Sequence, residues 1–349
     1  MTRYYTRACN FYYGDNSKKL IKLKKALPLN NRKDISFDHI EIMSRSSIKK
    51  ISIHQIKKLP KNLKNKIKID ISKITNSVKN FLSLDINKGT HLMGVLNVTP
   101  DSFSDGGKFI DSKKAIDHLK KLFNDGASIV DIGGESTRPG SKTITENEEW
   151  GRIENVLKNI KKNKVISIDT RKSVIMRKSL SLGVDMINDV SGLNYDKETI
   201  TVLKKSKTPF VLQHSLGDPE NMQLNPKYEN VILDIYDFFE QKISFLKKSG
   251  INHDKIFLDP GIGFGKNLTH NLQILKKISI FHTLGFPLLL GISRKRFIRD
   301  ISQKNDSSER LGGTISTGIF ALKQGVQLLR VHDVNEMQQG LKVYQELIR

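Results

Sequence analysis

Polar and charged side chains recur at the ends of apolar runs from His91 to the C-terminus. They are Asn97, Glu135, Asp169, Asn188, His214, Asp259, Lys295, Arg330 and His332. Carboxylate and amide oxygens accept hydrogen bonds from N–H groups, whereas arginine, lysine and histidine hold anions. The set therefore suits a ligand that has an N–H-rich edge at one end and an anionic group at the other.

The apolar runs themselves predict the scaffold that positions these groups. They are HLMGVLNVT (91–99), SIVDIGG (128–134), VISIDT (165–170), MINDV (186–190), PFVLQH (209–214), KIFLDP (255–260), PLLLGIS (287–293) and LLRVHDV (328–334). Continuous apolar runs are typical of parallel strands covered on both faces, and each gap is long enough for a crossover helix. We expect an α/β fold, a (β/α)8 TIM barrel over residues 89–349, with the active site on the loops that follow the strands.

Three of the strand ends form an acceptor-rich pocket in this scheme. Asp169, Asn188 and Asp259 point at one axis and favour an edge with several N–H groups, as in an amino-pyrimidinone. Metal binding is the alternative for two aspartates, but the nearby ammonium of Lys295 competes with a cation and favours the heterocycle. GIGFG (261–265) lacks the G-x-G-x-x-G spacing of dinucleotide-binding loops.

Two polar loops follow the first two strands. NVTPDSFSDGG (97–107) begins with Asn97, whose amide oxygen could ligate Mg2+, and adds Asp101 and Asp105. GGESTRPGS (133–141) places Arg138 beside Thr137, which suits a diphosphate or a carboxylate. A plain turn in which Glu135 pairs with Arg138 is the alternative for this second loop.

The last two strands add further anion-binding groups. Arg330 and His332 are two residues apart on a strand and so share a face. Loops after the last two strands of a barrel commonly hold phosphate. Arg138, Arg330 and His332 around one anion would suit an oxyanion leaving group.

Residues 1–88 form a basic extension, with 21 Lys/Arg against 6 Asp/Glu in a chain whose net charge is +23. Solvated positions filled by lysine, contact with nucleic acid or an anionic membrane surface, and a presequence are the possible explanations. ISFDHIEIMS (35–44) alternates like a half-buried strand, and 52–67 has near-helical spacing. We expect a small α+β unit, packed on the barrel or on another subunit, with NKGTH (87–91) as the linker.

The cysteine content and the hydropathy of the sequence indicate the cellular compartment of the protein. The single cysteine, Cys9, excludes an internal disulfide and a multi-cysteine zinc site, and fits a reducing compartment. Neither a membrane span nor a secretory signal is indicated. We therefore expect a cytoplasmic protein.

Together the motifs closely resemble those of the dihydropteroate synthase family, in the family's order. They are MGVLNVTPDSFSDGG (93–107), DIGGESTRPGS (131–141), SIDT (167–170), MINDVSG (186–192), DPGIGFGK (259–266), GISRKRF (291–297) and RVHDV (330–334). The resemblance implies a transferase of folate biosynthesis. It would condense 6-hydroxymethyl-7,8-dihydropterin diphosphate with 4-aminobenzoate to give 7,8-dihydropteroate and diphosphate.

The resemblance also implies site residues. Asp169, Asn188, Asp259, Phe264 and Lys295 would bind the pterin, and Thr137, Arg138, Arg330 and His332 the diphosphate, with Asn97 ligating its Mg2+. Thr137, Pro139, Phe264, Lys295 and Arg296 would bind 4-aminobenzoate. Arg138, Lys295, Arg330 and His332 would serve catalysis by neutralising charge on the leaving group, and Asp105 by facing a pterin cation when the first loop closes.

Two positions depart from the family pattern, and two other functions remain open. Gln213 stands where an apolar residue often lines the pterin site, and Arg296 stands where some members have serine. A methyltetrahydrofolate-binding barrel would share the pterin contacts but has no use for a diphosphate site. A non-catalytic protein that binds nucleic acid through residues 1–88 would explain the charge alone. The resemblance further suggests a homodimer and sensitivity to sulfonamides.

Overall fold

The computed structural model describes residues 2–81, 84–99, 108–137, 140–160, 163–217, 222–251 and 253–349. Within these ranges the C-terminal part of the chain forms an eight-stranded parallel sheet in the order β10-β9-β8-β7-β6-β5-β12-β11. Its strands are β5 (His91–Asn97), β6 (Ile129–Gly133), β7 (Val165–Asp169), β8 (Met186–Asp189), β9 (Phe210–Gln213), β10 (Ile256–Asp259), β11 (Leu289–Gly291) and β12 (Leu328–Val331). A parallel bridge between Leu258 and Leu288 links β10 to the start of β11 and closes the ring. The predicted TIM barrel is confirmed.

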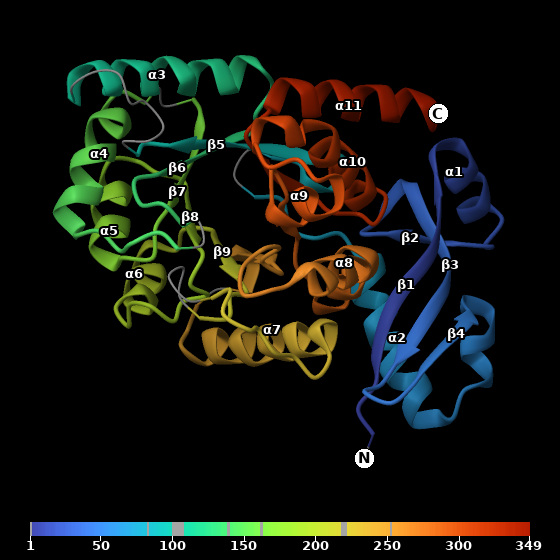
Figure 1. Ribbon diagram of the computed structural model, residues 1–349. Coiled ribbons are helices and arrows are strands. Elements are labelled where there is room, and N and C mark those ends of the chain that lie inside the picture. The colour runs from blue at the N-terminus through green and yellow to red at the C-terminus, as the bar shows by residue number, and fades with distance from the viewer. Residues whose placement is uncertain are drawn as a thin grey trace.

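Helices surround this barrel (Figure 1). They are α3 (Lys108–Asn124), α4 (Glu146–Lys158), α5 (Ser173–Ser181), α6 (Thr199–Ser206), α7 (Val231–Lys248), α8 (Leu268–Lys277), α9 (Arg296–Ser302), α10 (Leu311–Leu322) and α11 (Val334–Leu347), with short 3-10 turns η4 (His253–Lys255), η5 (Ile278–Leu284) and η6 (Ser308–Arg310). Side-chain capping sets several of their starts. Thr145 and Glu148 form a capping box at α4, and Asn230 caps α7.

Most strands are shorter than their apolar runs. The run 287–293 contributes only β11, because Pro287 has no N–H to donate and Leu288 makes a single bridge. At the carboxyl ends the last one or two residues of several strands are polar and still belong to the ladder, as Asn97, Asp169 and Asp259 do, whereas His332 follows β12. The polar groups therefore gather at the carboxyl ends of the strands.

The barrel interior is apolar at one end and polar at the other. The N-terminal end is filled by Met93, Ile129, Met186, Val211, Phe257, Leu289 and Leu328. At the other end the register aligns Asn97 with Gly133, Gly133 with Asp169, and Asp169 with Asn188. Parallel pairing thus gathers the polar residues at the edge where barrel active sites form.

The segment between the extension and the barrel closes the apolar end. Val78, Phe81 and Ile86 are buried against the barrel's inner residues, and the Phe81 ring lies 4.3 Å from the ring of Phe257 between centroids. The linker predicted over 87–91 is shorter than expected, because residues 87–88 belong to η2 (Ile86–Lys88) and His91 begins β5. Burial of these apolar side chains holds residues 78–81 and 84–86 against the apolar end of the barrel.

The extension forms an antiparallel sheet with two helices. Its elements are β1 (Tyr5–Tyr13), α1 (Gly14–Lys22), β2 (Leu27–Leu29), β3 (Arg32–Met43), β4 (Ile48–Ser52), η1 (Ile53–Lys58) and α2 (Lys61–Thr75). β3 pairs with β1, β2 and β4. The helical spacing predicted over 52–67 is divided between η1 and α2, because Pro60 holds the preceding Leu59 in an extended conformation.

The extension packs on the side of the barrel (Figure 1). Tyr5 and Met43 belong to the same buried apolar cluster as the barrel helices, and the Tyr5 ring packs edge-on against Tyr236 at 5.2 Å between centroids. Asn30 contacts buried His282 of η5 through a 3.3 Å hydrogen bond. Among the described residues, no helix is both long and apolar enough to cross a membrane.

Candidate functional site

An ion-pair cluster lies in the polar end of the barrel. Arg330 on β12 donates from Nε to Asp131 Oδ2 at 2.6 Å and from Nη2 to Asp169 Oδ2 at 2.7 Å. Asn188 Nδ2 donates to the same Asp131 oxygen at 2.9 Å. Burial alone would lower the pKa of Arg330, but the negative charges of Asp131 and Asp169 outweigh it and hold that pKa above its usual value. One guanidinium thus joins three strands across the barrel.

Asp131 is a site residue that sequence reasoning missed. It is fully buried in the middle of β6. The signal was available, because an aspartate inside an otherwise apolar strand requires a charged or donating partner. Its partners, Arg330 and Asn188, are far away in the chain and are identified only by the fold.

Free acceptor atoms remain beside this cluster. Asp169 Oδ1 and Asn188 Oδ1 are buried and have no hydrogen-bond partner among the described residues. Asp259 on β10 accepts from the backbone N–H of Gly261 at 2.7 Å. Buried oxygens without partners are costly, so this arrangement favours a ligand that donates N–H groups to them. The structure therefore brings the three predicted acceptors together around Arg330, as the predicted acceptor pocket requires.

Burial shifts the pKa values of these carboxylic acids upward. It raises the pKa of Asp259 to about 6, against the opposing effects of the Gly261 N–H and of Lys295. It also raises the pKa of Asp169, although the positive charge of Arg330 opposes the shift. Both groups therefore gain from a ligand that donates to, or is positively charged beside, the ionised form.

Lys295 and Phe264 meet above the acceptor pocket. The Lys295 ammonium lies 4.3 Å from the centroid of the Phe264 ring, and burial together with Arg330 lowers the pKa of Lys295 to about 8. Phe264 packs in turn with Val190 and Met222 in a small buried cluster. An aromatic ligand beside this pair would have both an aromatic ring and an ammonium group as neighbours.

The loop GIGFG that carries Phe264 lies against the loop after β9. A Cβ at Gly261 would be 2.0 Å from the carbonyl oxygen of His214, and one at Gly265 would be 2.5 Å from that of Leu216. Both glycines have positive φ, at 68° and 61°. Only glycine permits this approach and this conformation, which fixes the place of the Phe264 backbone.

Buried Lys266 ties the same two loops together and was not predicted as a site residue. Its ammonium donates to the carbonyl oxygens of Phe264 at 2.8 Å and His214 at 3.3 Å, and lies 3.0 Å from His214 Nδ1. Burial lowers the pKa of Lys266 to about 7 and that of His214 well below its usual value. His214, one of the predicted strand-end groups, therefore contacts Lys266 within the protein.

His332 faces Ser293 at the end of β12. Its Nδ1 lies 3.0 Å from Ser293 Oγ, which also accepts from the His332 backbone N–H at 3.2 Å. Burial, with a smaller effect of Arg330, lowers the pKa of His332 to about 3. When the Ser293 hydroxyl donates to Nδ1, the neutral ring keeps its proton on Nε2 and can donate it to an anion.

The remaining predicted residues fall in three groups. Asn97, the last residue of β5, and Thr137, in the second loop after β6, are both half-buried. Arg296 begins α9 with a side chain that is 61 % exposed. Asp101, Asp105, Arg138 and Pro139 lie outside the described residues.

Glu135 makes contacts other than the alternative pairing with Arg138. Its carboxylate accepts from Arg171 Nε at 3.0 Å, Lys172 Nζ at 2.9 Å and the N–H of Ile144 at 3.0 Å. Lys172 also donates to buried Glu149 at 2.6 Å. This buried network joins both ends of the second loop to the end of β7.

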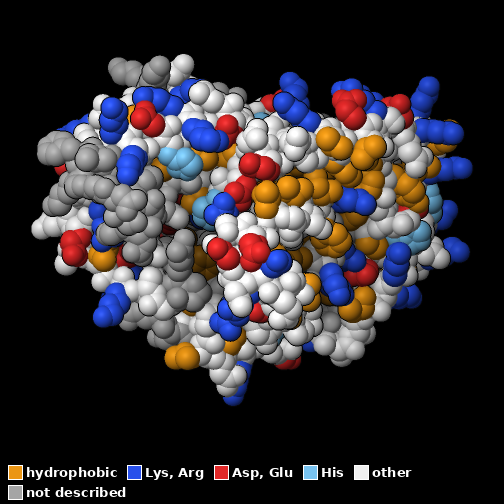
Figure 2. All heavy atoms as spheres, turned by 45° about the horizontal axis from the view of Figure 1, so that its top comes forward, with side chains coloured by type: hydrophobic (Ala, Val, Ile, Leu, Met, Phe, Trp, Pro, Cys, Tyr) orange, Lys and Arg blue, Asp and Glu red, His pale blue; other side chains and the backbone are white. Residues whose placement is uncertain are grey.

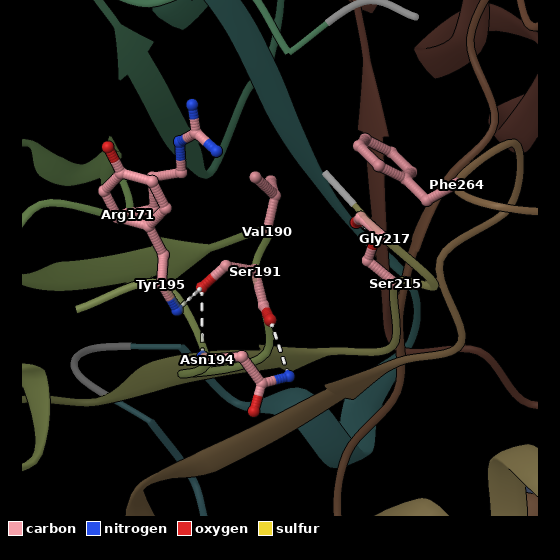
Figure 3. Close-up of a pocket in the computed structure, with 8 residues that line it drawn as sticks. All are labelled: Arg171, Val190, Ser191, Asn194, Tyr195, Ser215, Gly217 and Phe264. Carbon is pink, nitrogen blue, oxygen red and sulfur yellow. Dashed lines mark hydrogen bonds between the residues drawn. The ribbon is translucent and has the colours of Figure 1, made fainter. Parts of the chain in front are cut away.

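A pocket of about 240 Å³ opens beside these groups (Figure 3). It is lined by Arg171, Val190, Ser191, Asn194, Tyr195, Ser215, Gly217 and Phe264. The Arg171 guanidinium stacks on the Tyr195 ring at 4.1 Å. Gln213, the first departure from the family pattern, is buried next to this region and its Nε2 donates to Val190 O at 3.4 Å.

Comparison with known proteins identifies relatives of the barrel. A family model described as pterin binding enzyme matches residues 93–332. The chain is 40 % identical over 262 residues to the dihydropteroate synthase of Synechocystis sp., covering 74 % of this chain and 91 % of that protein. It is 40 % identical over 255 residues to that of Escherichia coli K12, covering 72 % and 90 %.

Solved structures show the same similarity. Yersinia pestis dihydropteroate synthase in a sulfonamide drug complex superposes with a TM-score of 0.71 at 37 % identity, covering 76 % of this chain and 96 % of that one. The Clostridium difficile enzyme with pteroic acid has a TM-score of 0.71 at 39 % identity, with coverage of 76 % and 98 %. The Xanthomonas albilineans enzyme with 4-aminobenzoic acid has a TM-score of 0.70 at 35 % identity, covering 74 % and 93 %.

Proposed function

The chain belongs to the family of pterin binding enzymes, and we propose that it is a dihydropteroate synthase. It is a transferase of folate biosynthesis that joins (7,8-dihydropterin-6-yl)methyl diphosphate to 4-aminobenzoate and releases diphosphate. The observation that carries this function is the group of buried acceptors Asp169, Asn188 and Asp259 around Arg330, with the positive charge of Lys295 close to both aspartates. A pterin presents the complementary N–H-rich edge.

Each group in the pocket has a defined task in the proposed reaction. Asp169, Asn188 and Asp259 accept from the pterin, and Lys295 supplies a donor beside them. Arg330, together with Arg138, Thr137 and the Nε2 proton of His332, binds the diphosphate and stabilises the charge that grows on it as the bond to the methylene carbon breaks. The amine of 4-aminobenzoate then attacks that carbon, so the pocket must exclude water until the amine arrives. We assign to Asp105 the role of facing the pterin cation when the first loop closes and excludes water.

We assign Mg2+ as the cofactor, held by Asn97 and the substrate's diphosphate. One amide oxygen together with a diphosphate suits Mg2+, which is commonly bound by one or two protein oxygens and by substrate phosphates. Among the described residues, no group of three or more His, Cys, Asp or Glu side chains could hold a metal by itself. When bound, the ion neutralises charge on the departing diphosphate.

The second substrate has its site above the pterin. We place 4-aminobenzoate against Phe264 and Lys295, with Thr137, Pro139 and exposed Arg296 around it. The 4.3 Å contact between Lys295 and Phe264 supports this placement because it offers a ring face and a positive charge to an aromatic carboxylate.

Exposed apolar side chains support a homodimer formed through the late helices. Phe320, Val343 and Leu347 are 45 %, 55 % and 79 % exposed on α10 and α11. Figure 2 shows apolar side chains gathered on the side where Figure 1 places these helices. Large apolar areas of this kind mark protein interfaces. We assign the dimer to the cytoplasm, in keeping with the single buried, unpaired cysteine.

The decisive experiment measures diphosphate release by the full-length protein with dihydropterin diphosphate and Mg2+, with and without 4-aminobenzoate. We expect release that depends on 4-aminobenzoate, stops with a chelator and yields dihydropteroate. Tight pterin binding without turnover would reject the function and favour a pterin-binding methyl-transfer barrel.

The pKa values of two pocket groups predict the pH profile of kcat/KM for the pterin substrate. Asp259 is ionised above about pH 6 and Lys295 is protonated below about pH 8. Activity should therefore rise through pH 6, stay high, and fall through pH 8. Rate measurements from pH 5 to 9 test this. Asp259→Asn should change the midpoint and steepness of the acid limb without removing it, because burial also raises the pKa of Asp169. An acid limb that is the same in the variant and in the wild type would contradict a role for Asp259.

Lys266 provides a prediction for the second substrate. In Lys266→Met the carbonyls of Phe264 and His214 lose a common donor, so Phe264 is held less firmly. We expect the KM for 4-aminobenzoate to rise about tenfold, since an unpaired buried acceptor costs about 1–3 kcal/mol, and the KM for the pterin substrate to change little. Steady-state kinetics measure both, with exposed Lys276→Met as the control. Equal changes in both KM values would contradict a specific effect on Phe264.

A further inference from the structure

The basic extension contacts the beginning of helix α7 through one arginine. Arg45 donates from Nη1 to Glu229 Oε2 at 2.9 Å and to Asp234 Oδ1 at 2.7 Å, and from Nη2 to Asp237 Oδ2 at 2.9 Å. These bonds, of which the one to Asp234 has the largest effect, hold the pKa of Arg45 well above its usual value. Three carboxylates of the barrel therefore share one cation from the extension.

The carboxylate of Asp234 connects Arg45 to the turn that precedes α7. While Oδ1 accepts from Arg45, Oδ2 accepts from the backbone N–H groups of Glu229 at 3.0 Å and Asn230 at 3.1 Å. Asp234 thus fixes the chain that enters α7. Arg45 neutralises Asp234 and also binds the side chain of Glu229, so it stabilises this turn from two sides.

The residues just before this turn hold the loop that carries Phe264. Tyr228 OH donates to the carbonyl of Gly265 at 2.8 Å, and Gln223 Nε2 donates to that of Gly263 at 2.5 Å. These two carbonyls flank Phe264 in the chain. The Tyr228 ring is partly buried beside the His214 ring, at 6.0 Å between centroids. The entry into α7 therefore supports the aromatic face of the proposed 4-aminobenzoate site.

We propose that the extension braces the 4-aminobenzoate site through Arg45, which is a positioning residue for Phe264. The connection runs from Arg45 through Asp234 and Glu229 to Tyr228 and the carbonyl of Gly265. This inference rests on the proposed function, because it concerns the site of the second substrate. Arg45 lies outside the region that the family shares, so the brace is a contribution of this chain's own extension.

The size of the effect follows from exposure. The Arg45 side chain is 37 % exposed, and exposed ion pairs contribute little because solvent and salt screen them. We expect Arg45→Ala to raise the KM for 4-aminobenzoate about threefold at low salt. The KM for the pterin substrate should change less than that for 4-aminobenzoate, because Asp169 and Asn188, which are assigned its polar contacts, are held by Asp131 and Arg330 and not by the entry into α7.

Arg3 provides a matched control within the same extension and on the same helix. It shares Asp237 with Arg45, at 3.1 Å, and contacts Glu240 at 2.5 Å, further along α7 from the turn, and its side chain is 47 % exposed. Arg3→Ala removes a comparable surface ion pair. We expect it to leave both KM values unchanged, while any loss of thermal stability should be similar in the two variants.

A double-mutant cycle with Tyr228→Phe tests the connection itself. Tyr228→Phe removes the bond to Gly265 and should raise the KM for 4-aminobenzoate. Adding Arg45→Ala to Tyr228→Phe should then have almost no further effect, because both changes act through the same turn. Kinetics of the four full-length proteins, with calorimetry of each, supply the data.

The outcomes separate this inference from the proposed function. If the wild-type protein forms no dihydropteroate, the proposed function fails. If it does, and Arg45→Ala changes the melting temperature but neither KM, Arg45 is only structural and the brace is rejected. Independent, multiplicative effects of Arg45→Ala and Tyr228→Phe would also reject it.

Discussion

Arg330→Met is expected to abolish most activity and to destabilise the fold. The variant removes the cation that pairs with Asp131 and Asp169 in the barrel interior. Leaving buried charges without their partner costs about 3–5 kcal/mol of the free energy of unfolding. The loss of a donor to the departing diphosphate should lower kcat by about 10²–10³-fold. Urea unfolding and steady-state kinetics measure the two effects separately.

Two further variants divide the structural effect from the catalytic one. Arg330→Lys keeps the positive charge, but lysine lacks the planar guanidinium that binds two carboxylates at once. Compared with Arg330→Met, the free energy of unfolding should therefore recover more than kcat. Asp131→Asn combined with Arg330→Met removes one of the two unpaired charges and should regain stability while activity stays low. If the double variant is no more stable than Arg330→Met, uncompensated charge is not the cause of the loss.

Phe81→Ala is expected to lower the free energy of unfolding by about 3–5 kcal/mol, as for other buried aromatic residues. Phe81 is 3 % exposed and fills the apolar end of the barrel against Phe257. Because the active site lies at the opposite end, KM and kcat of the folded protein should remain near those of the wild type. Denaturation by urea, followed at several wavelengths, measures the change.

Phe245→Ala serves as the control for Phe81→Ala, since Phe245 is 51 % exposed. Its effect on stability should be small. A loss of stability in Phe81→Ala no larger than in Phe245→Ala would show that the segment from Val78 to Ile86 does not close the barrel in solution. A large loss would instead make this segment a structural part of the barrel, despite its position before the first barrel strand.

Part of the site could be predicted from the sequence alone. Asp169, Asn188 and Asp259 were identifiable because each lies at the carboxyl end of a buried apolar strand, and parallel strands place these ends at one edge. Lys295 was identifiable in the same way, because it follows the seventh apolar run, whereas Phe264 was identified only through the family resemblance. Their contact at 4.3 Å required the structure.

The sequence by itself determined the barrel, its polar end and the basic character of the extension, because strand periodicity, helix spacing and charge are local properties of the chain. Only the tertiary structure decided which distant groups meet. Asp131 with Arg330, Lys266 with His214, and Arg45 with Asp234 are pairs separated by 199, 52 and 189 residues. Such pairings depend on packing and on the balance between burial and charge, which no local pattern specifies.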